Sequence, residues 1–557
     1  MPVKRILALL TLAATSLAAQ PQQQPNQLPK LTETIDVKVI NVDVVVTDKK
    51  GNPITGLTKD DFELYENGQP KLISNFYEVE GKKASNISLT PAGAEKPVEA
   101  KPEEISENLR RRIVFYIDNL SLMPFNRNRV FKEMKEFAKN VMRPGDEAMI
   151  ATFNRSMKIR TNFTRDPAQI QQTLDAIAGE SALGVANKSE RRDFENRIQD
   201  AEDYDTAVAT ARQYAESVNH DLRQSIESLN GLMTTLAGVE GKKILVLTTE
   251  GFQIQPGREM FYLVDEIARE KGWQSGGTML EGMSYNANNA IEGVAKTANA
   301  NGITMYAIHA GGLGAGNENS LAERDKPIPY AVTAAALSNS TESLQLLAEE
   351  TGGLASINTN NFSGAFKNIQ RDLDSYYSLG YRAGTERVDR QRSIDVRVRN
   401  RNYVVRARQS FVEKSTFAEM SDRVIANLLY KTKANDLNIR VKINTPVPAD
   451  DLFKVPVEIQ IPMEGLTLLP QGEQYMGGFT IYVAVANKDN DMSDVAQKQQ
   501  QIRVPAPDMA KIKGKYYTYT LDLLMERGVN RVSIGVVDDV SNVTGFDRQQ
   551  VIAQDLR

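Results

Sequence analysis

The sequence contains no cysteine, so neither disulfide bonds nor thiolate metal ligands can stabilise this fold. A cysteine nucleophile is excluded for the same reason. Histidine is almost as scarce, because the chain has only His220 and His309. These two lie far apart and in different local patterns, which argues against a histidine-rich metal centre. A serine–histidine–aspartate triad would have to use one of them.

The chain also lacks an excess of either charge. Its 67 basic and 71 acidic residues give a formal net charge of -4 over 557 residues. Proteins that bind nucleic acids usually gather a basic excess on one face, so no nucleic-acid partner is expected. The composition is that of an ordinary globular protein, and the length predicts two to four domains.

Long apolar runs are missing after the first residues. Lys4 and Arg5 precede an apolar run from Ile6 to Ala19 that ends in small residues, which is the pattern of a signal peptide over residues 1–19. The run is shorter than the roughly 20 residues that span a bilayer. We therefore expect an exported protein with no transmembrane segment after signal cleavage. Periplasm, outer surface and extracellular space all stay open as destinations.

The first folded part is predicted to be a small β-domain over residues 34–80, after a flexible Gln/Pro-rich segment at 20–33. Apolar and polar residues alternate from Ile35 to Val46, and a second hairpin turns at Asn67-Gly68, the preferred pair for a tight turn. Residues 81–108 lack periodicity and collect Lys, Ala, Pro and Glu, which indicates a linker.

Residues 109–412 alternate buried strands with helical periods, which predicts an α/β domain with a doubly wound, Rossmann-like parallel sheet. The predicted strands are 113–117, 148–153, 243–248 and 303–308. Apolar residues spaced three and four apart predict a helical insertion at about 180–235. We expect its C-terminal half to pack on the sheet and its upstream part to project as an arm or helical hairpin.

The last part of the chain returns to short strands. Residues 413–434 are predicted to form a connecting helix, centred on Phe417 to Lys431. Residues 435–557 then contain regular short strands separated by turns, as in a β-sandwich. The predicted fold class is therefore α/β plus β.

The candidate site lies where ligands bind in doubly wound sheets, just after the carboxyl ends of the strands. Asp118 and Ser121 follow the first α/β strand, and Thr248-Thr249-Glu250-Gly251 follow a later one. At these positions the chain resembles von Willebrand factor type A (VWA) domains, which carry an Asp-x-Ser-x-Ser motif and an Asp-Gly pair. The resemblance implies a metal-ion-dependent adhesion site, in which these groups and a threonine hold a divalent cation that a ligand carboxylate completes.

More specifically, the whole chain resembles acidobacterial VWFA-related secreted proteins. The motifs that carry this resemblance are Val44 to Asp48, Leu57 to Phe62, Gly145-Asp146, Leu347 to Gly353, Tyr376 to Tyr381 and Val405 to Arg408. They cover nearly the entire chain after the signal, although the last β-domain matches loosely.

The departures from the VWA pattern matter for the metal. Leu120 and Leu122 stand where the two hydroxyl ligands belong, Ser121 is out of phase with them, and Glu250 replaces the second aspartate. The threonine of the third loop is expected near residues 181–189, where no Gly-Thr signature occurs. Mg²⁺ needs near-octahedral oxygen ligands, whereas Ca²⁺ tolerates irregular sets.

Two interpretations of this site follow. In the first, Asp118, Ser121 and Glu250 form a degenerate site for Mg²⁺ or Ca²⁺. In the second, Asp118 and Glu250 cap helix N-termini or pair with Arg127 or Arg129.

Other candidates are weaker. His309 precedes a Gly-rich loop at 310–316 that has neither a P-loop Lys-Ser/Thr nor a G-x-G-x-x-G opening a helix, so we expect a plain loop. Asp538-Asp539 and Asp489 to Asp491 are expected to be solvated turns. Tyr376 and Tyr377 are expected to be core residues.

Three functions remain in order of preference. The first is an exported, non-catalytic adhesion-type protein that uses the VWA-like domain, with its degenerate site for Mg²⁺ or Ca²⁺, to bind a protein or a cell-surface ligand. No other cofactor is expected. The second is a periplasmic assembly or scaffolding factor that acts through the helical insertion without metal. A hydrolase comes third, because the chain lacks cysteine, has little histidine and contains no G-x-S-x-G elbow. The sequence leaves the oligomeric state open.

Overall fold

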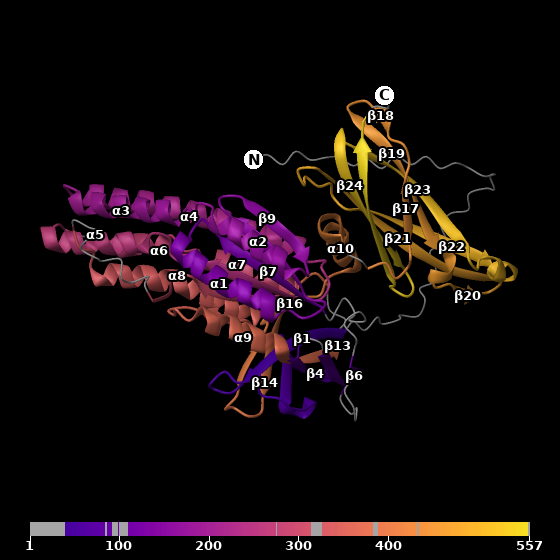
Figure 1. Ribbon diagram of the computed structural model, residues 1–557, viewed down its shortest axis with the longest axis horizontal. Helices are drawn as coiled ribbons and strands as arrows, with labels where there is room; N and C mark the ends of the chain where they lie inside the picture. The colour runs from indigo at the N-terminus through magenta and orange to yellow at the C-terminus, as the bar shows by residue number, and fades with distance from the viewer. Residues whose placement is uncertain are drawn as a thin grey trace. The chain divides into compact units, whose positions relative to one another are not determined.

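The computed structural model describes residues 39–83, 86–91, 98–99, 110–274, 276–313, 326–382, 388–431 and 434–554. The predicted signal peptide and flexible segment lie outside these residues. The described residues form two compact units. One comprises 39–234 together with 240–413, and the other comprises 235–239 together with 414–554. Figure 1 shows the elements of both units.

A six-stranded sheet forms the centre of the first unit. Its strands are β7 (Arg111–Asp118), β8 (Glu147–Phe153), β9 (Met157–Thr164), β10 (Lys242–Thr249), β11 (Ile303–His309) and β12 (Ala355–Ser356). Their order in space is β12-β11-β10-β7-β8-β9, and all neighbours are parallel except β8 and β9. Numbered along the chain, this is the 3-2-1-4-5-6 order of doubly wound sheets. The strand positions predicted from apolar runs are confirmed.

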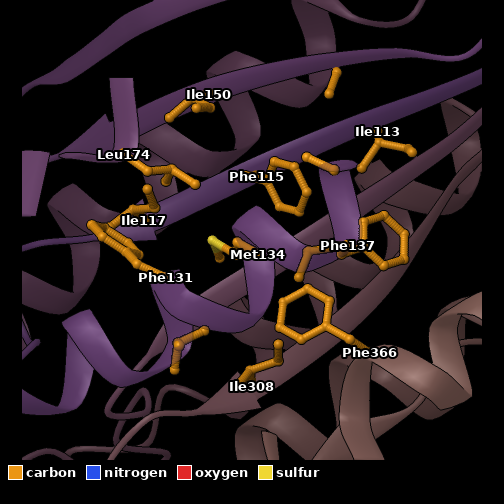
Figure 2. Packing of buried hydrophobic residues seen from close by; sticks show 14 of the residues in the cluster. Ile113, Phe115, Ile117, Phe131, Met134, Phe137, Ile150, Leu174, Ile308 and Phe366 are labelled. Atoms are coloured by element: carbon orange, nitrogen blue, oxygen red, sulfur yellow. The ribbon is translucent and has the colours of Figure 1, made fainter. Parts of the chain in front are cut away.

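Helices cover both faces of this sheet. On one face, α1 (Pro124–Asn140), α2 (Pro167–Ala178) and α9 (Phe362–Asp374) share a core with the strands. Figure 2 shows Phe115 of β7 among Phe137 of α1, Phe366 of α9 and their neighbours. The ring centroids of Phe115 and Phe137 are 6.2 Å apart with an edge-on geometry, the preferred arrangement for aromatic pairs. The parallel strands β7, β8, β10 and β11 supply side chains to both covered faces, so they are largely apolar and buried.

The other face is covered by α4 (Tyr204–Thr235), α7 (Asn288–Ala300) and α8 (Tyr330–Thr351). The Tyr116 hydroxyl of β7 lies 3.2 Å from Ser228 Oγ in the C-terminal half of α4. On β11, the backbone N–H of Met305 donates to Thr351 Oγ1 at the end of α8 over 3.0 Å. The C-terminal half of α4 therefore packs on the sheet.

The predicted helical insertion forms two helices, α3 (Gly184–Asp200) and α4, with a break at residues 201–203. At 1.5 Å per residue, the 32 residues of α4 extend for about 48 Å. Arg197 hydrogen-bonds to Gln213 and Ser217 to Glu190, so the two helices run antiparallel as a hairpin. Their apolar residues pack with α5 (Arg258–Lys271) and α8 in a second core, and α6 (Thr278–Ser284) lies against α5.

The strands of the N-terminal β-domain do not pair only with one another. They are β1 (Val39–Thr47), β2 (Phe62–Glu66), β3 (Gln69–Lys71) and β4 (Ile73–Lys83), and their later partners are β13 (Ser375–Arg382), β14 (Gln391–Val398), β15 (Val404–Ala407) and β16 (Ser410–Val412). One sheet has the order β15-β1-β13-β4-β5-β6 and the other β16-β14-β2-β3.

This pairing corrects two predicted boundaries. Residues 34–80 were expected to form a β-domain of their own and residues 109–412 an α/β domain, but 375–412 complete the sheets that 39–83 begin. The predicted linker at 81–108 contains two strands, β5 (Asn86–Pro91) and β6 (Val98–Glu99), and its remaining residues from 84 to 108 lie outside the described ones. The hairpin turn is as predicted, with positive φ angles of 49° at Asn67 and 76° at Gly68.

The second unit contains a helix and two sheets. Helix α10 (Thr416–Tyr430) lies where the connecting helix was predicted. The two sheets have the orders β17-β19-β18, with β23 on β19, and β20-β21-β24-β25, with β22 on β21. Their strands are β17 (Arg440–Ile443), β18 (Val447–Ala449), β19 (Leu452–Pro462), β20 (Leu469–Gln471), β21 (Gln474–Asn487), β22 (Ala496–Pro505), β23 (Tyr516–Met525), β24 (Gly528–Asp538) and β25 (Thr544–Ala553). Apolar residues from both sheets share one core.

No helix in the described ranges combines the length and the apolar content that crossing a membrane requires.

Candidate functional site

The candidate site lies at the point where the strand order of the α/β sheet reverses, between β7 and β10. From β7 the chain moves outward through β8 to β9, and then returns to the other side of β7 at β10. In doubly wound sheets, ligands bind at this position, outside the carboxyl ends of the two strands. Asp118 ends β7 and Thr249 ends β10, so the fold itself brings the two residues together.

A compact hydrogen-bonded cluster joins these two strand ends. Asp118 Oδ2 accepts hydrogen bonds from Ser121 Oγ and from Thr249 Oγ1, each over 2.7 Å. The two hydroxyl oxygens lie 2.9 Å apart. Each hydroxyl also accepts a backbone N–H over 3.0 Å, from Glu250 to Ser121 and from Gly251 to Thr249. Both hydroxyl protons are therefore directed to one carboxylate oxygen.

The cluster is closed to solvent. Asp118 is 2 % exposed and Thr249 is 0 % exposed. Burial raises the pKa of Asp118, and the hydrogen bonds from Ser121 and Thr249 offset this only in part. Asp118 Oδ1 is buried and has no hydrogen-bond partner among the described residues. The second carboxyl oxygen is thus the natural place for a proton when Asp118 is neutral.

Ser121 corrects a sequence expectation. Its position out of phase with the VWA hydroxyls was expected to point it away from the site, but its hydroxyl faces Asp118. The reason is a tight turn, in which the N–H groups of Ser121 and Leu122 both donate to the Asp118 carbonyl over 3.2 Å. Leu122 is turned inward instead and is 0 % exposed, in the core that the sheet shares with α1, α2 and α9. Leu120 is also buried.

Glu250 faces away from Asp118. Its Oε1 accepts hydrogen bonds from the backbone N–H of Met123 over 2.9 Å and from Asn126 Nδ2 over 3.0 Å. Met123 is the residue that precedes the first turn of α1, so Glu250 stabilises the N-terminus of that helix. The helix-capping interpretation is therefore confirmed for Glu250.

Asp118 does not form the predicted pair with Arg127. The Arg127 guanidinium donates to Asn119 Oδ1 and to the carbonyls of Ala178 and Glu180. Arg127 therefore connects Asn119, the residue that follows Asp118, to the end of α2.

The segment expected to supply a third-loop threonine contacts the same loop through other groups. The N–H of Leu183 donates to the Asn119 carbonyl over 2.8 Å, and Asn187 Nδ2 donates to the Leu120 carbonyl over 2.9 Å. Gly184 lies so close that a β-carbon there would collide with the carbonyl oxygens of Ser121 and Leu122. The start of α3 therefore seals the loop after β7.

The hydroxyl that sequence reasoning missed is that of Thr249. From the sequence, Thr249 was placed after the strand, next to Glu250, but was not included among the candidate site residues. The signal that could have found it is its place as the last residue of a buried strand next to the switch point.

These residues do not fit a divalent cation as they are arranged. Asp118 is the one carboxylate in the cluster, Glu250 being used at α1, and both hydroxyls already accept an N–H and donate to Asp118. Mg²⁺ keeps several waters in a near-octahedral shell, whereas Asp118 and Thr249 are closed to solvent. In the described part of the chain, no three His, Asp or Glu side chains are grouped closely enough to hold a metal ion.

The weaker sequence candidates have structural roles. His309 is buried, which lowers its pKa, and residues 314–316 of the loop after it lie outside the described ones. Asp538 was expected to be solvated but is fully buried, because it accepts hydrogen bonds from the N–H groups of Thr467 and Val540. Tyr377 is a core residue as predicted.

Exposed apolar side chains also lie at this edge of the sheet. Phe125 in the first turn of α1 is 74 % exposed, and Leu313 in the loop after β11 is 64 % exposed. The Arg129 guanidinium lies 5.8 Å from the Phe125 ring centroid and 5.0 Å from that of Phe362, at the start of α9. Asn360 Oδ1 accepts the N–H of Leu313 over 3.3 Å. We call Phe125, Leu313 and Arg129 the apolar rim.

No protein-family model and no curated protein matches the chain. Among solved structures, the chain is similar to an aerotolerance-related membrane protein from Bacteroides fragilis, with 11 % identity, 48 % of this chain and 98 % of that chain covered, and a TM-score of 0.23. The vWF domain of the type V pili tip protein Mfa5 from Porphyromonas gingivalis gives 12 % identity, coverages of 48 % and 95 %, and a TM-score of 0.25. Manganese-loaded TRAP from Plasmodium vivax has 9 % identity, with 55 % of this chain and 96 % of that chain covered and a TM-score of 0.21. TM-scores this low do not establish a common fold.

Proposed function

We propose that this chain is an exported, non-catalytic binding protein whose VWA-like α/β domain recognises a protein partner at the carboxyl edge of its sheet, without a metal ion. The observation that carries the proposal is the combination at this edge of a hydrogen-bonded polar cluster, which joins the two strand ends, and an exposed apolar rim. In the proposed mechanism, Asp118, Ser121 and Thr249 hold the loops in place, and the rim makes the contact.

The rim has the chemistry of a protein-binding surface. Exposed aromatic and aliphatic side chains next to an arginine are enriched at the centres of protein interfaces, where large rigid side chains bury much area at a small entropic cost. Arg129 lies over two rings, which keeps its charge available while its stem covers apolar surface. A partner with an apolar pocket and an acidic border would fit this arrangement.

The cluster supports a positioning role instead of catalysis. Ser121 and Thr249 direct their protons to a carboxylate and are not paired with a histidine base in any contact described above. A nucleophilic hydroxyl needs an adjacent base and access to substrate, and Thr249 has no access. This arrangement favours a binding protein over a hydrolase.

The test is cross-linking in the native organism followed by mass spectrometry of captured proteins. The Phe125→Ser/Leu313→Ser variant should lose its main cross-linked partner. The matched control is Leu72→Ser, which removes a side chain that is 92 % exposed between β3 and β4. Equal capture of the same partner by the double variant and the control would refute binding through the rim.

Calorimetric titration with Mg²⁺, Mn²⁺ and Ca²⁺ tests the metal-independent part. We expect no binding at millimolar concentrations of any of the three ions. Saturable heat that disappears in Asp118→Ala would instead show an ion site and overturn this part. Export is tested separately, by N-terminal mass spectrometry of the protein recovered from its native cells, which should begin near residue 19 or 20.

A second candidate surface is on the helical region. Leu280 and Met283 of α6 are three residues apart, so they share one helix face, and both are exposed. Helix α6 lies outside the insertion at about 180–235 but is joined to α4 by the Arg212–Glu281 ion pair, so this surface adjoins the one that the scaffolding alternative uses. Because α3 and the first half of α4 belong to a packed core, deleting them would unfold the region, so Leu280→Ser/Met283→Ser is the better test. Loss of the partner in this variant, with capture retained in the rim variant, would favour scaffolding.

A further inference from the structure

A cavity lies at the amino ends of the α/β strands, at the edge of the sheet opposite to Asp118 and Thr249. It has a volume of about 510 Å³ and is lined by the first residues of β10 and β11, including Lys242 and Thr304, and by one face of the sheet that contains β1, β13 and β15. On that face Asp43 and Ser378 stand opposite each other in the register. All of these residues belong to the first unit. Cavities of this volume accommodate small molecules.

The lining of this cavity is strongly basic. Among the described residues, its basic side chains are those of Lys242, Lys243, Arg406 and Arg408, whereas its acidic side chain is that of Asp43 alone. Basic groups in a low-dielectric recess repel one another and attract an anion more strongly than they would in water.

Two of these cations have carboxylate partners. Arg406 binds Asp372 with two hydrogen bonds, over 2.7 and 2.6 Å, and also donates to the Gly353 carbonyl. Lys242 Nζ lies 3.1 Å from Asp43 Oδ2 and 3.1 Å from the centre of the Tyr376 ring. The charge of Arg406 is therefore balanced by Asp372, which is outside the lining, whereas Lys242 pairs with Asp43, the one acidic side chain of the lining.

Arg408 has no carboxylate partner in the described part of the chain. Its Nη2 donates to the Asn41 carbonyl over 2.6 Å, and its Phe411 neighbour contributes only a ring face at 5.9 Å. The Nε atom is buried and has no hydrogen-bond partner. Burial lowers the pKa of Arg408, and the negative charge of Asp43 offsets this only in part. A buried donor without an acceptor is costly, so the position is suited to an acceptor from a ligand.

We infer that this cavity binds a small anionic molecule, with Arg408 donating to a carboxylate or phosphate oxygen and Lys242 supplying the second positive charge. Arginine is the side chain best matched to the geometry of both oxyanions. Ser378 and Thr304 add hydroxyl groups to the lining. The site is independent of the proposed partner surface, because it lies at the amino ends of the same strands.

The test is isothermal titration calorimetry of the purified chain with inorganic phosphate, glycerol 3-phosphate, citrate and uncharged glycerol. At least one of the three anions should bind saturably at one site per chain, and glycerol should not bind. Comparing the affinities for phosphate and glycerol 3-phosphate with the affinity for citrate distinguishes a phosphate ligand from a carboxylate ligand. Affinity should fall as ionic strength rises.

Two variants connect this binding to the cavity. Arg408→Gln should weaken the affinity at least about tenfold, because a charge-assisted hydrogen bond is lost. The matched control Arg269→Gln removes an exposed arginine of α5 and should leave the affinity unchanged. If Arg408→Gln fails to fold, Lys242→Gln/Asp43→Asn tests the same cavity without leaving an unpaired carboxylate, and it should also weaken binding.

Absence of binding by all three anions up to about 10 mM, or equal affinity in Arg408→Gln and Arg269→Gln, would overturn the inference. Neither result depends on the partner-capture experiment, so failure here would leave the proposed function intact.

Discussion

The hydroxyl of Thr249 offers a direct test of the cluster at the switch point. We predict that Thr249→Val destabilises the first unit by about 3 kcal/mol. Valine fills nearly the same volume, so the loss comes from hydrogen bonds and not from a cavity. The substitution removes the 2.7 Å bond to Asp118 Oδ2, and it also leaves the Gly251 N–H without its acceptor at 3.0 Å. A bond to a charged group contributes about 1.5–3 kcal/mol, and an unsatisfied buried donor costs about 1–3 kcal/mol.

The neighbouring Thr248 is a matched control. It is as buried as Thr249, on the same strand, but its hydroxyl has no hydrogen-bond partner among the described residues. Removing a buried, unsatisfied hydroxyl relieves a desolvation cost, so Thr248→Val should have no effect or stabilise the unit by about 1 kcal/mol.

The assay uses the single tryptophan of the chain. Trp273 packs against the helical core of the first unit, so its fluorescence during urea denaturation reports on that unit and not on the second one. This matters because a chain with two units need not unfold in one step. Equal shifts of the midpoint in Thr249→Val and Thr248→Val would refute the assigned role of the Thr249 hydroxyl.

Three further predictions use the same fluorescence assay. Because burial raises the pKa of Asp118 in the fold, its contribution to stability is greatest below its ordinary value of 3.8 and falls as pH rises to the folded value. The Asp118→Asn side chain does not titrate, so the stability of this variant relative to the parent protein should increase as pH rises through that range. A stability difference between variant and parent that is independent of pH would contradict this. Gly184→Ala should destabilise by about 1–3 kcal/mol because the new methyl group collides with the loop after β7, whereas Gly231→Ala, with open space in α4, should stabilise by about 0.5–1 kcal/mol. Arg392→Ala leaves two carboxylates, those of the buried Glu66 and of Glu413, without the guanidinium that lies 2.9 Å from each, and should cost about 3–5 kcal/mol. Part of this should be recovered in Glu66→Gln/Arg392→Met, and no recovery would argue against the Glu66 pair.

The α/β sheet could be predicted from the sequence because its strands are local, continuous apolar runs. Each of the predicted strands at 113–117, 148–153, 243–248 and 303–308 is a run that only a doubly covered sheet can bury. The residues after each predicted strand were taken as the ligand-binding edge, which placed Asp118 at the end of β7, where the structure has it.

The pairing of the small β-sheets could not be predicted in this way. Val44 of β1 pairs with Tyr377 of β13, more than 300 residues away, and no local pattern encodes that register. The alternation around Val44 correctly indicated a strand with one buried face but did not identify its partner.

The directions of the side chains in the loop after β7 could not be predicted from the sequence either. Spacing alone put Ser121 out of phase, but two hydrogen bonds to the Asp118 carbonyl tighten the turn and reverse its direction. Glu250 shows the converse, since a carboxylate at a plausible ligand position is used by a helix N-terminus that lies close only in three dimensions.

The composite β-sheets also constrain how this chain can be made. Strand β4 ends at Lys83 and its partner β13 begins at Ser375, so about 290 residues must be synthesised before the first sheet can close. At typical rates of 5–20 residues per second, this takes roughly 15–60 s, during which the apolar face of β1 has no partner. Unpaired apolar strands are templates for aggregation. The α/β region lies in the sequence between the strands at 39–83 and their partners at 375–412, so it is synthesised before these sheets can form. A chaperone that binds residues 39–83 during this time would raise the yield of the native chain.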